Sequence, residues 1–178
     1  MAPRLDTMTP SEIADKALAD FGYTAGTVPV EKIAKSHGII IRYSPLDDEL
    51  SGMIYIKDGQ AIMGVNAIHH PNRQRFTIGH ETGHYLMHRD TLMLSDEIHV
   101  DKGFPTTLMR DATSATGIER MEIQANQFAA ALLMPKAVIL SALEGKTFDI
   151  DNEKPIEELA KRLRVSKQAL EFRIRNGL

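Results

Sequence analysis

The sequence predicts an α+β fold in which helices pack on a small antiparallel sheet of about three strands. Two observations carry this prediction. Helical and β-branched segments occur in runs of one type, and the regular strand–helix–strand alternation of parallel α/β proteins is absent. In addition, Asp58-Gly59 separates two short apolar runs, which is typical of a tight hairpin turn because both positions tolerate positive φ angles.

The composition indicates a globular protein. The 178 residues suit one domain with a small appendage, and hydrophobic residues make up 43% and charged residues 25% of the chain. A net charge of −3 argues against a protein whose whole surface binds nucleic acid. The absence of cysteine excludes disulfides, thiolate metal sites and thiol catalysis. With no secretory-signal pattern and no apolar run long enough to span a bilayer, we expect a cytoplasmic protein without a membrane partner.

The first half of the chain supplies two helices and the strands. Thr9-Pro10-Ser11-Glu12 forms a capping box that opens a helix, and Gly22 ends it. A second short helix follows Pro29 and ends at Gly38. The β-branched residues 39–41 predict a strand, and two further strands flank the Asp58-Gly59 turn.

The second half is mainly helical. A helix is predicted from residue 71 to about 88 and another from 117 to 134, which ends before Pro135. Residues 89–115 are long for a loop, and 106–110 are a candidate extra strand. We divide the chain into a main domain over residues 1–150 and a C-terminal helix-turn-helix-like hairpin over 151–178 packed on it. The helices expected after Pro135 span 135–145, 155–163 and 167–175.

The sequence His80-Glu81-Thr82-Gly83-His84 lies in the helix predicted from residue 71. Residues four apart on a helix differ by about 40° around its axis, so both imidazoles project from one face and can meet on one Zn²⁺ ion. Zinc acidifies a water ligand, and Glu81 is placed to take its proton as general base. The alternative is that both histidines simply pack on an amphipathic helix.

A catalytic zinc site needs a third protein ligand. The metzincin pattern is excluded because Met87 and Asp90 stand where it has glycine and histidine. A glutamate on a later helix would complete the site, and both Glu119 and Glu122 are candidates. Asn126, one turn after Glu122, is placed to accept a hydrogen bond from a metal-binding histidine.

Two segments resemble signatures of the ImmA/IrrE family of metallopeptidases. Residues 73–88 (RQRFTIGHETGHYLMH) are similar to the zinc-helix segment of this family, and residues 122–135 (EIQANQFAAALLMP) to its second signature. The resemblance extends over about residues 10–175. It implies a compact zincin-like metallopeptidase domain of the gluzincin type, with His80, His84 and Glu122 as zinc ligands and Glu81 as general base.

The resemblance also implies a substrate, since family members relieve repression by cleaving a helix-turn-helix repressor after DNA damage or another stress. We therefore expect a zinc endopeptidase whose partner is a cognate repressor. One alternative is an anti-repressor of the same fold that binds this partner without cleaving it. Another is direct DNA binding through the C-terminal hairpin, which is locally basic but belongs to an acidic chain and is therefore disfavoured.

Several other residues near the expected site have two interpretations. His88 lies one turn after His84, and we expect it either to hydrogen-bond a ligand or simply to pack, and not to bind metal itself. Tyr85 is expected to pack, and Arg73 and Arg75 to anchor the start of their helix to acidic neighbours. Weaker candidates for a transition-state hydrogen-bond donor are His69, His70, His99 and Arg110.

Overall fold

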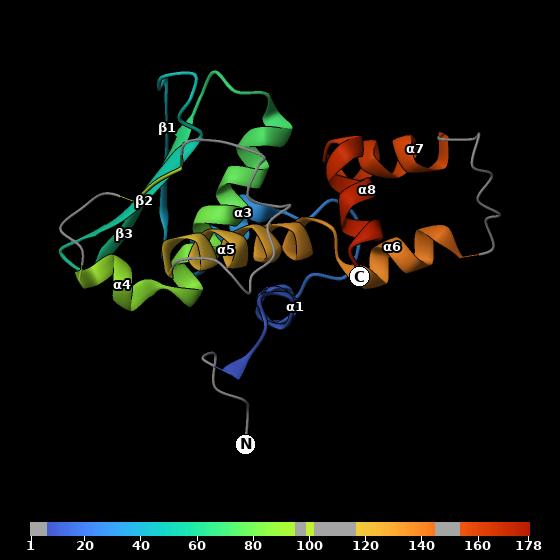
Figure 1. Cartoon of the computed structure of the whole chain (residues 1–178), viewed down its shortest axis with the longest axis horizontal. Coiled ribbons are helices and arrows are strands. Elements are labelled where there is room, and N and C mark those ends of the chain that lie inside the picture. Colours follow the sequence, from blue (N-terminus) through green and yellow to red (C-terminus); the bar gives the residue numbers. More distant parts are fainter. Residues whose placement is uncertain (1–6, 95–98, 102–116, 145–153) are drawn as a thin grey trace.

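The computed structural model describes residues 7–94, 99–101, 117–144 and 154–178. Within these ranges the chain forms eight helices and one four-stranded sheet (Figure 1). The α+β prediction is confirmed, because the three longest strands follow one another with no helix between them. Helix α3 (Pro71–Met87) packs against both α5 (Gly117–Leu133) and the sheet, so it lies between the two.

The N-terminal helices begin and end where the sequence predicts. Helix α1 (Pro10–Phe21) has Thr9 as its N-cap, with the predicted reciprocal hydrogen bonds to Glu12. Gly22 ends the helix in the left-handed conformation, with φ 76°. Helix α2 (Val30–Ser36) follows, and α1 packs on α5 while α2 packs on α3.

The strands are β1 (Ile40–Ser44), β2 (Gly52–Lys57), β3 (Gln60–Asn66) and β4 (His99–Asp101), in the spatial order β1-β3-β2-β4. The predicted hairpin is confirmed: β2 and β3 are antiparallel, and both turn residues have positive φ, 51° at Asp58 and 78° at Gly59. The sheet therefore has four strands where the sequence predicts about three.

The sheet is mixed where the sequence predicts an antiparallel one, because β1 runs parallel to β3 while the other strand pairs are antiparallel. The end of β1 and the start of β2 both lie beside the end of β3, where Ser44 pairs with Asn66 and Gly52 with Val65. The connection over residues 45–51 therefore passes around the end of β3, a step of two strand spacings or about 10 Å. The buried side chain of Asn66 holds this connection through hydrogen bonds to Leu46, Asp47 and Leu50.

The C-terminal part contains α6 (Lys136–Leu143), α7 (Lys154–Leu163) and α8 (Lys167–Arg175). Leu159, Leu163 and Leu170 of the last two helices are buried in the same apolar cluster as α5. Ser166 caps α8 as predicted. The proposed boundary at residue 150 lies outside the described residues.

The region between α3 and α5 is described in part. It contains α4 (Arg89–Leu94) and β4, while the candidate strand at 106–110 lies outside the described residues. Over the described ranges, no single helix has the length and apolarity of a membrane span. Helices α5 and α6 satisfy that criterion only as a pair, with a bend of 48° between them.

Candidate metal centre

The two histidines of α3 are buried and face each other. Pro71 occupies the first turn of the helix, and the His70 side chain caps it by accepting a hydrogen bond from the Asn72 N–H. His80 and His84 are 2% and 1% exposed, and their Nε2 atoms lie 3.0 Å apart. One turn of helix thus presents two nitrogen atoms to the same small volume.

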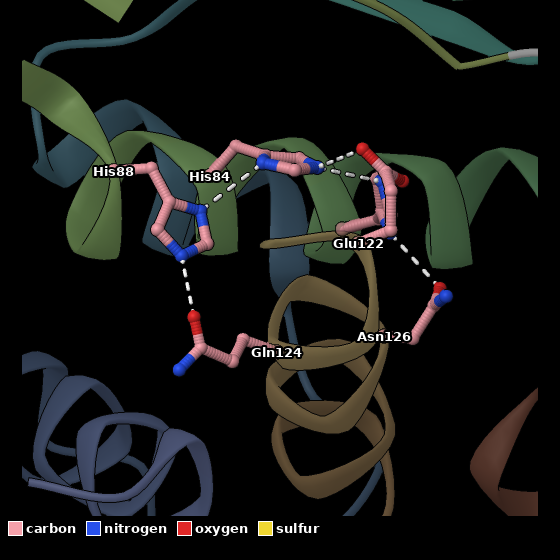
Figure 2. Close-up of polar contacts among 6 residues, drawn as sticks. His84, His88, Glu122, Gln124 and Asn126 are labelled. Carbon is pink, nitrogen blue, oxygen red and sulfur yellow. Dashed lines mark hydrogen bonds and ion pairs between the residues drawn. The ribbon is translucent and has the colours of Figure 1, made fainter. Parts of the chain in front are cut away.

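The third side chain comes from α5. The Oε2 atom of Glu122 lies 3.2 Å from His80 Nε2, and its Oε1 atom lies 3.3 Å from His84 Nε2 (Figure 2). Among the described residues, these three side chains form the one group whose ligand atoms are close enough to share a metal ion. Glu119, the alternative that the sequence leaves open, is not part of this group.

The proton positions on His80 follow from Asn126. The carbonyl oxygen Oδ1 of Asn126 lies 3.0 Å from His80 Nδ1 and can only accept a hydrogen bond (Figure 2). His80 Nδ1 therefore carries a proton. In the neutral imidazole, Nε2 then presents its lone pair toward Glu122. The sequence-based expectation that Asn126 orients a histidine thus corresponds to a hydrogen bond in the structure.

His84 is connected to α5 through a longer chain of hydrogen bonds. Its Nδ1 atom lies 3.2 Å from His88 Nδ1, and His88 Nε2 lies 2.9 Å from the carbonyl oxygen Oε1 of Gln124 (Figure 2). Since the carbonyl only accepts, His88 Nε2 donates to it, and the neutral His88 ring accepts at Nδ1. His84 Nδ1 is then the donor, which leaves the lone pair of His84 on Nε2.

The donor set fits a metal cation. With these proton positions, two nitrogen lone pairs and a carboxylate converge within 3.0–3.3 Å of one another. Three acceptors at this spacing repel one another unless a positive charge lies between them. The two imidazoles and the carboxylate therefore have the chemistry of a metal site, in which His80, His84 and Glu122 would be the ligands.

Glu81 is fully buried beside this group but is not part of it. Its carboxylate lies next to the first residue of β2, where a Cβ atom added to Gly52 would be 3.7 Å from Glu81 Oε1. The same added atom would collide with Thr77 Cγ2 of α3. Gly52 thus permits the close approach of α3 and β2 that surrounds Glu81.

The arginines at the start of α3 anchor the helix mainly through neutral oxygens. Arg73 donates to Ser51 Oγ, at 2.9 Å from its Nη2 atom, and Arg75 donates to the carbonyl oxygen of Val28. Among the described residues neither arginine has a carboxylate within ion-pair distance, because both guanidinium groups are partly buried where neutral oxygens are within reach, and Glu31 acts on Arg75 only through a longer-range attraction. Burial lowers the pKa of Arg75 from its usual value.

Of the remaining candidates, three have described side chains, and each of these has a structural contact. His69 Nε2 lies 3.0 Å from the carbonyl oxygen of Asp48, so His69, like the capping His70, belongs to the structure that begins α3. The guanidinium carbon Cζ of Arg89 lies over the Tyr85 ring, 5.1 Å from the centroid of that ring. This contact agrees with the packing role expected for Tyr85. The side chains of His99 and Arg110 lie outside the described residues.

The sequence analysis missed Gln124 and the glycines that bring the elements together. Gln124 lies two residues from Glu122, a spacing that places it on another face of α5 and so gives no periodic signal. Gly79 and Gly83 are four residues apart in the interior of α3, and this spacing was a readable signal of a close helix contact. The structure shows this contact with Ala129 and Phe128 of α5.

Comparison with known proteins agrees with this geometry. Residues 34–175 match the peptidase M78 family, described as the IrrE N-terminal-like domain. The chain belongs to this family. The match includes both the histidine helix α3 and the glutamate helix α5.

Two individual relatives illustrate the extent of the similarity. The chain is 39% identical over 105 residues to the radiation response metalloprotease IrrE of Deinococcus radiodurans, an alignment that covers 57% of this chain and 27% of that protein. The fold is similar to that of a Mycobacterium tuberculosis transcriptional regulator, with a TM-score of 0.61 at 20% identity over 93% of this chain and 46% of the other. This M78 protein therefore matches only part of each longer relative.

Proposed function

We propose that this chain is a zinc-dependent endopeptidase. The observation that carries the proposal is the convergence of His80 Nε2, His84 Nε2 and the Glu122 carboxylate within 3.0–3.3 Å of one another. Tetrahedral zinc with imidazole and carboxylate ligands places neighbouring ligand atoms about 3.4 Å apart, close to these separations. Three protein ligands leave a fourth position for water or substrate, which distinguishes catalytic from structural zinc sites.

Zinc in this position would polarise a substrate carbonyl and lower the pKa of a water molecule. The chain itself supplies the base. Glu81 follows His80 directly in α3, and its buried carboxylate takes the water proton and transfers it to the amine of the departing peptide. Burial beside β2 excludes bulk solvent from this carboxylate, which keeps the transferred proton within the site.

The proposed substrate is a helix-turn-helix transcriptional repressor encoded near this protein. This part of the proposal is supported by the family resemblance. The similarity to a protein described as a radiation response metalloprotease also supports a role in stress regulation. Cleavage at a specific site in the repressor would relieve repression, whereas an anti-repressor without catalysis would achieve the same result by forming a complex.

The test uses the Glu81→Gln variant, which keeps the shape of the side chain and removes the base. The purified protein with zinc is incubated with the repressor from the adjacent reading frame, with and without a chelator. We expect wild type to cleave the repressor in a chelator-sensitive way. The variant should bind zinc normally and cleave at least about 100-fold more slowly, since a general base contributes roughly 10²–10⁴ in rate.

Glu158→Gln is the matched control, because this glutamate is exposed on α7. It should cleave at the wild-type rate. Cleavage by Glu81→Gln at the wild-type rate would contradict the proposed role of Glu81. A stable complex of wild-type protein with intact repressor, in the presence of zinc, would instead support the anti-repressor.

A further inference from the structure

Every second residue of α5 from Glu122 to Asn126 contacts a histidine that lies in α3 or, in the case of His88, directly follows it as its C-cap. Glu122 approaches His80 and His84 directly, Asn126 contacts His80, and Gln124 contacts His88 (Figure 2). Successive helical residues advance by about 100°, so Gln124 points about 200° away from Glu122 around the helix axis. The Gln124 amide therefore does not reach His80 or His84, and it contacts His88, the histidine farthest along the chain from His80.

His88 spans this gap because it lies one turn beyond His84. The two rings are tilted at 56° with centroids 5.3 Å apart, and their Nδ1 atoms are 3.2 Å apart. On its other side, His88 Nε2 donates to Gln124 Oε1 at 2.9 Å. The neutral His88 ring thus donates from Nε2 to the amide carbonyl of Gln124 and accepts at Nδ1 from the Nδ1–H group of His84.

We infer that His88 and Gln124 are positioning residues that prepare His84 to bind the metal, an inference that rests on the proposed metal centre. A neutral imidazole exists in two tautomers, and only the form protonated at Nδ1 presents its Nε2 lone pair toward Glu122. The relay from Gln124 through His88 selects this form and fixes the ring orientation. Hydrogen bonds of this kind to metal-binding histidines also raise their basicity as ligands.

The relay differs from the arrangement at His80 in its exposure. Asn126 contacts His80 directly, whereas His88 and Gln124 both line a cavity of about 460 Å³ between the ends of α1, α3 and α4. The loss of the His88 ring would therefore enlarge an existing cavity and would not open a new void in the core. For this reason the fold should tolerate substitutions at His88 and Gln124.

The test measures the zinc affinity of the whole chain by competition with a chromogenic chelator, together with the unfolding midpoint of the metal-free protein. His88→Ala should bind zinc about 10–100-fold more weakly, the usual effect of losing such a partner. Gln124→Leu should weaken zinc binding in the same direction. His88→Gln should recover most of the affinity, because its amide offers an acceptor to His84 and a donor to Gln124.

Thr91→Ala is the matched control, since Thr91 lines the same cavity and is not part of the relay. It should keep wild-type zinc affinity, and all four variants should unfold near the wild-type midpoint without metal. Absorption of the Co²⁺-loaded protein provides a second readout: the ligand-field bands should change in His88→Ala and Gln124→Leu and not in Thr91→Ala.

Wild-type zinc affinity in both His88→Ala and Gln124→Leu would overturn the inference, as would an equal loss in Thr91→Ala. Should His88→Ala fail to fold, Gln124→Leu and His88→Gln still decide it. Zinc affinity is measured without any substrate, so absence of peptidase activity in the wild type would refute the proposed reaction and leave the relay supported by its own data. Absence of zinc binding by the wild type would refute both.

Discussion

Gly83 of α3 packs so closely against Phe128 of α5 that a Cβ atom added to the glycine would lie 2.9 Å from Phe128 Cδ1. Gly83 directly precedes His84, and the contact lies between Glu122 and the end of α5. A contact of this kind sets how near the two helices approach. It therefore also sets the 3.2–3.3 Å separations between the glutamate and the two imidazoles.

The first prediction concerns this contact. Gly83→Ala should lower the free energy of unfolding by about 1–2 kcal/mol, because overpacking costs more than the helix preference of alanine contributes. Zinc affinity should fall as well, since α5 must move away from α3. Urea denaturation and chelator competition measure the two effects. Gly117→Ala is the control: among the described residues, no atom of another part of the fold lies within 4 Å of the added Cβ, so this variant should be at least as stable as wild type.

The second prediction concerns Asn66, whose fully buried side chain holds the connection between β1 and β2. Asn66→Ala removes hydrogen bonds to the backbone of Leu46, Leu50 and Ile68 and leaves these groups unsatisfied. We expect a loss of about 3 kcal/mol in unfolding free energy, measured by urea denaturation. Asn176→Ala, at an exposed asparagine, should have a small effect; equal losses in the two variants would contradict the structural role of Asn66.

The third prediction separates hydrogen bonding from packing at Asn126. Asn126→Leu should weaken zinc binding about 10–100-fold, because His80 Nδ1 loses its acceptor. Asn126→Asp keeps an acceptor oxygen and should retain tight zinc binding. Isothermal titration or chelator competition provides the measurement. Gln127→Leu, at an exposed position of the same helix, should bind zinc as wild type does; comparable weakening there would indicate a general effect on α5.

The fourth prediction concerns metal removal. A ligand that binds only the folded state stabilises it by about 2.7 kcal/mol when its concentration is 100-fold above the dissociation constant. Zinc should therefore raise the thermal midpoint of the wild type, and a chelator should reverse this rise. Glu122→Gln removes the carboxylate and should show little or no zinc-dependent rise. A rise of wild-type size in Glu122→Gln would mean that zinc stabilises the protein at another place.

The elements that were predicted correctly are those specified by local sequence. The capping box at Thr9 and the Asp58-Gly59 turn each involve side chains and backbone within a few residues. The parallel pairing of β1 with β3 was not predicted, because it depends on how residues 45–51 pass around Asn66. Pairing partners in a sheet are determined by such tertiary contacts and leave no periodic signal in either strand.

By itself, the sequence determined that His80 and His84 share one face of a helix, because helical periodicity alone fixes that relationship. It also placed Glu119, Glu122 and Asn126 together on a second helix, where the family resemblance favoured Glu122 as the ligand but periodicity alone did not show how near any of them lies to the histidines. Only the tertiary structure decided this. The angle and depth at which α5 crosses α3 depend on close-packed contacts between residues far apart in the chain, and no local pattern encodes such contacts.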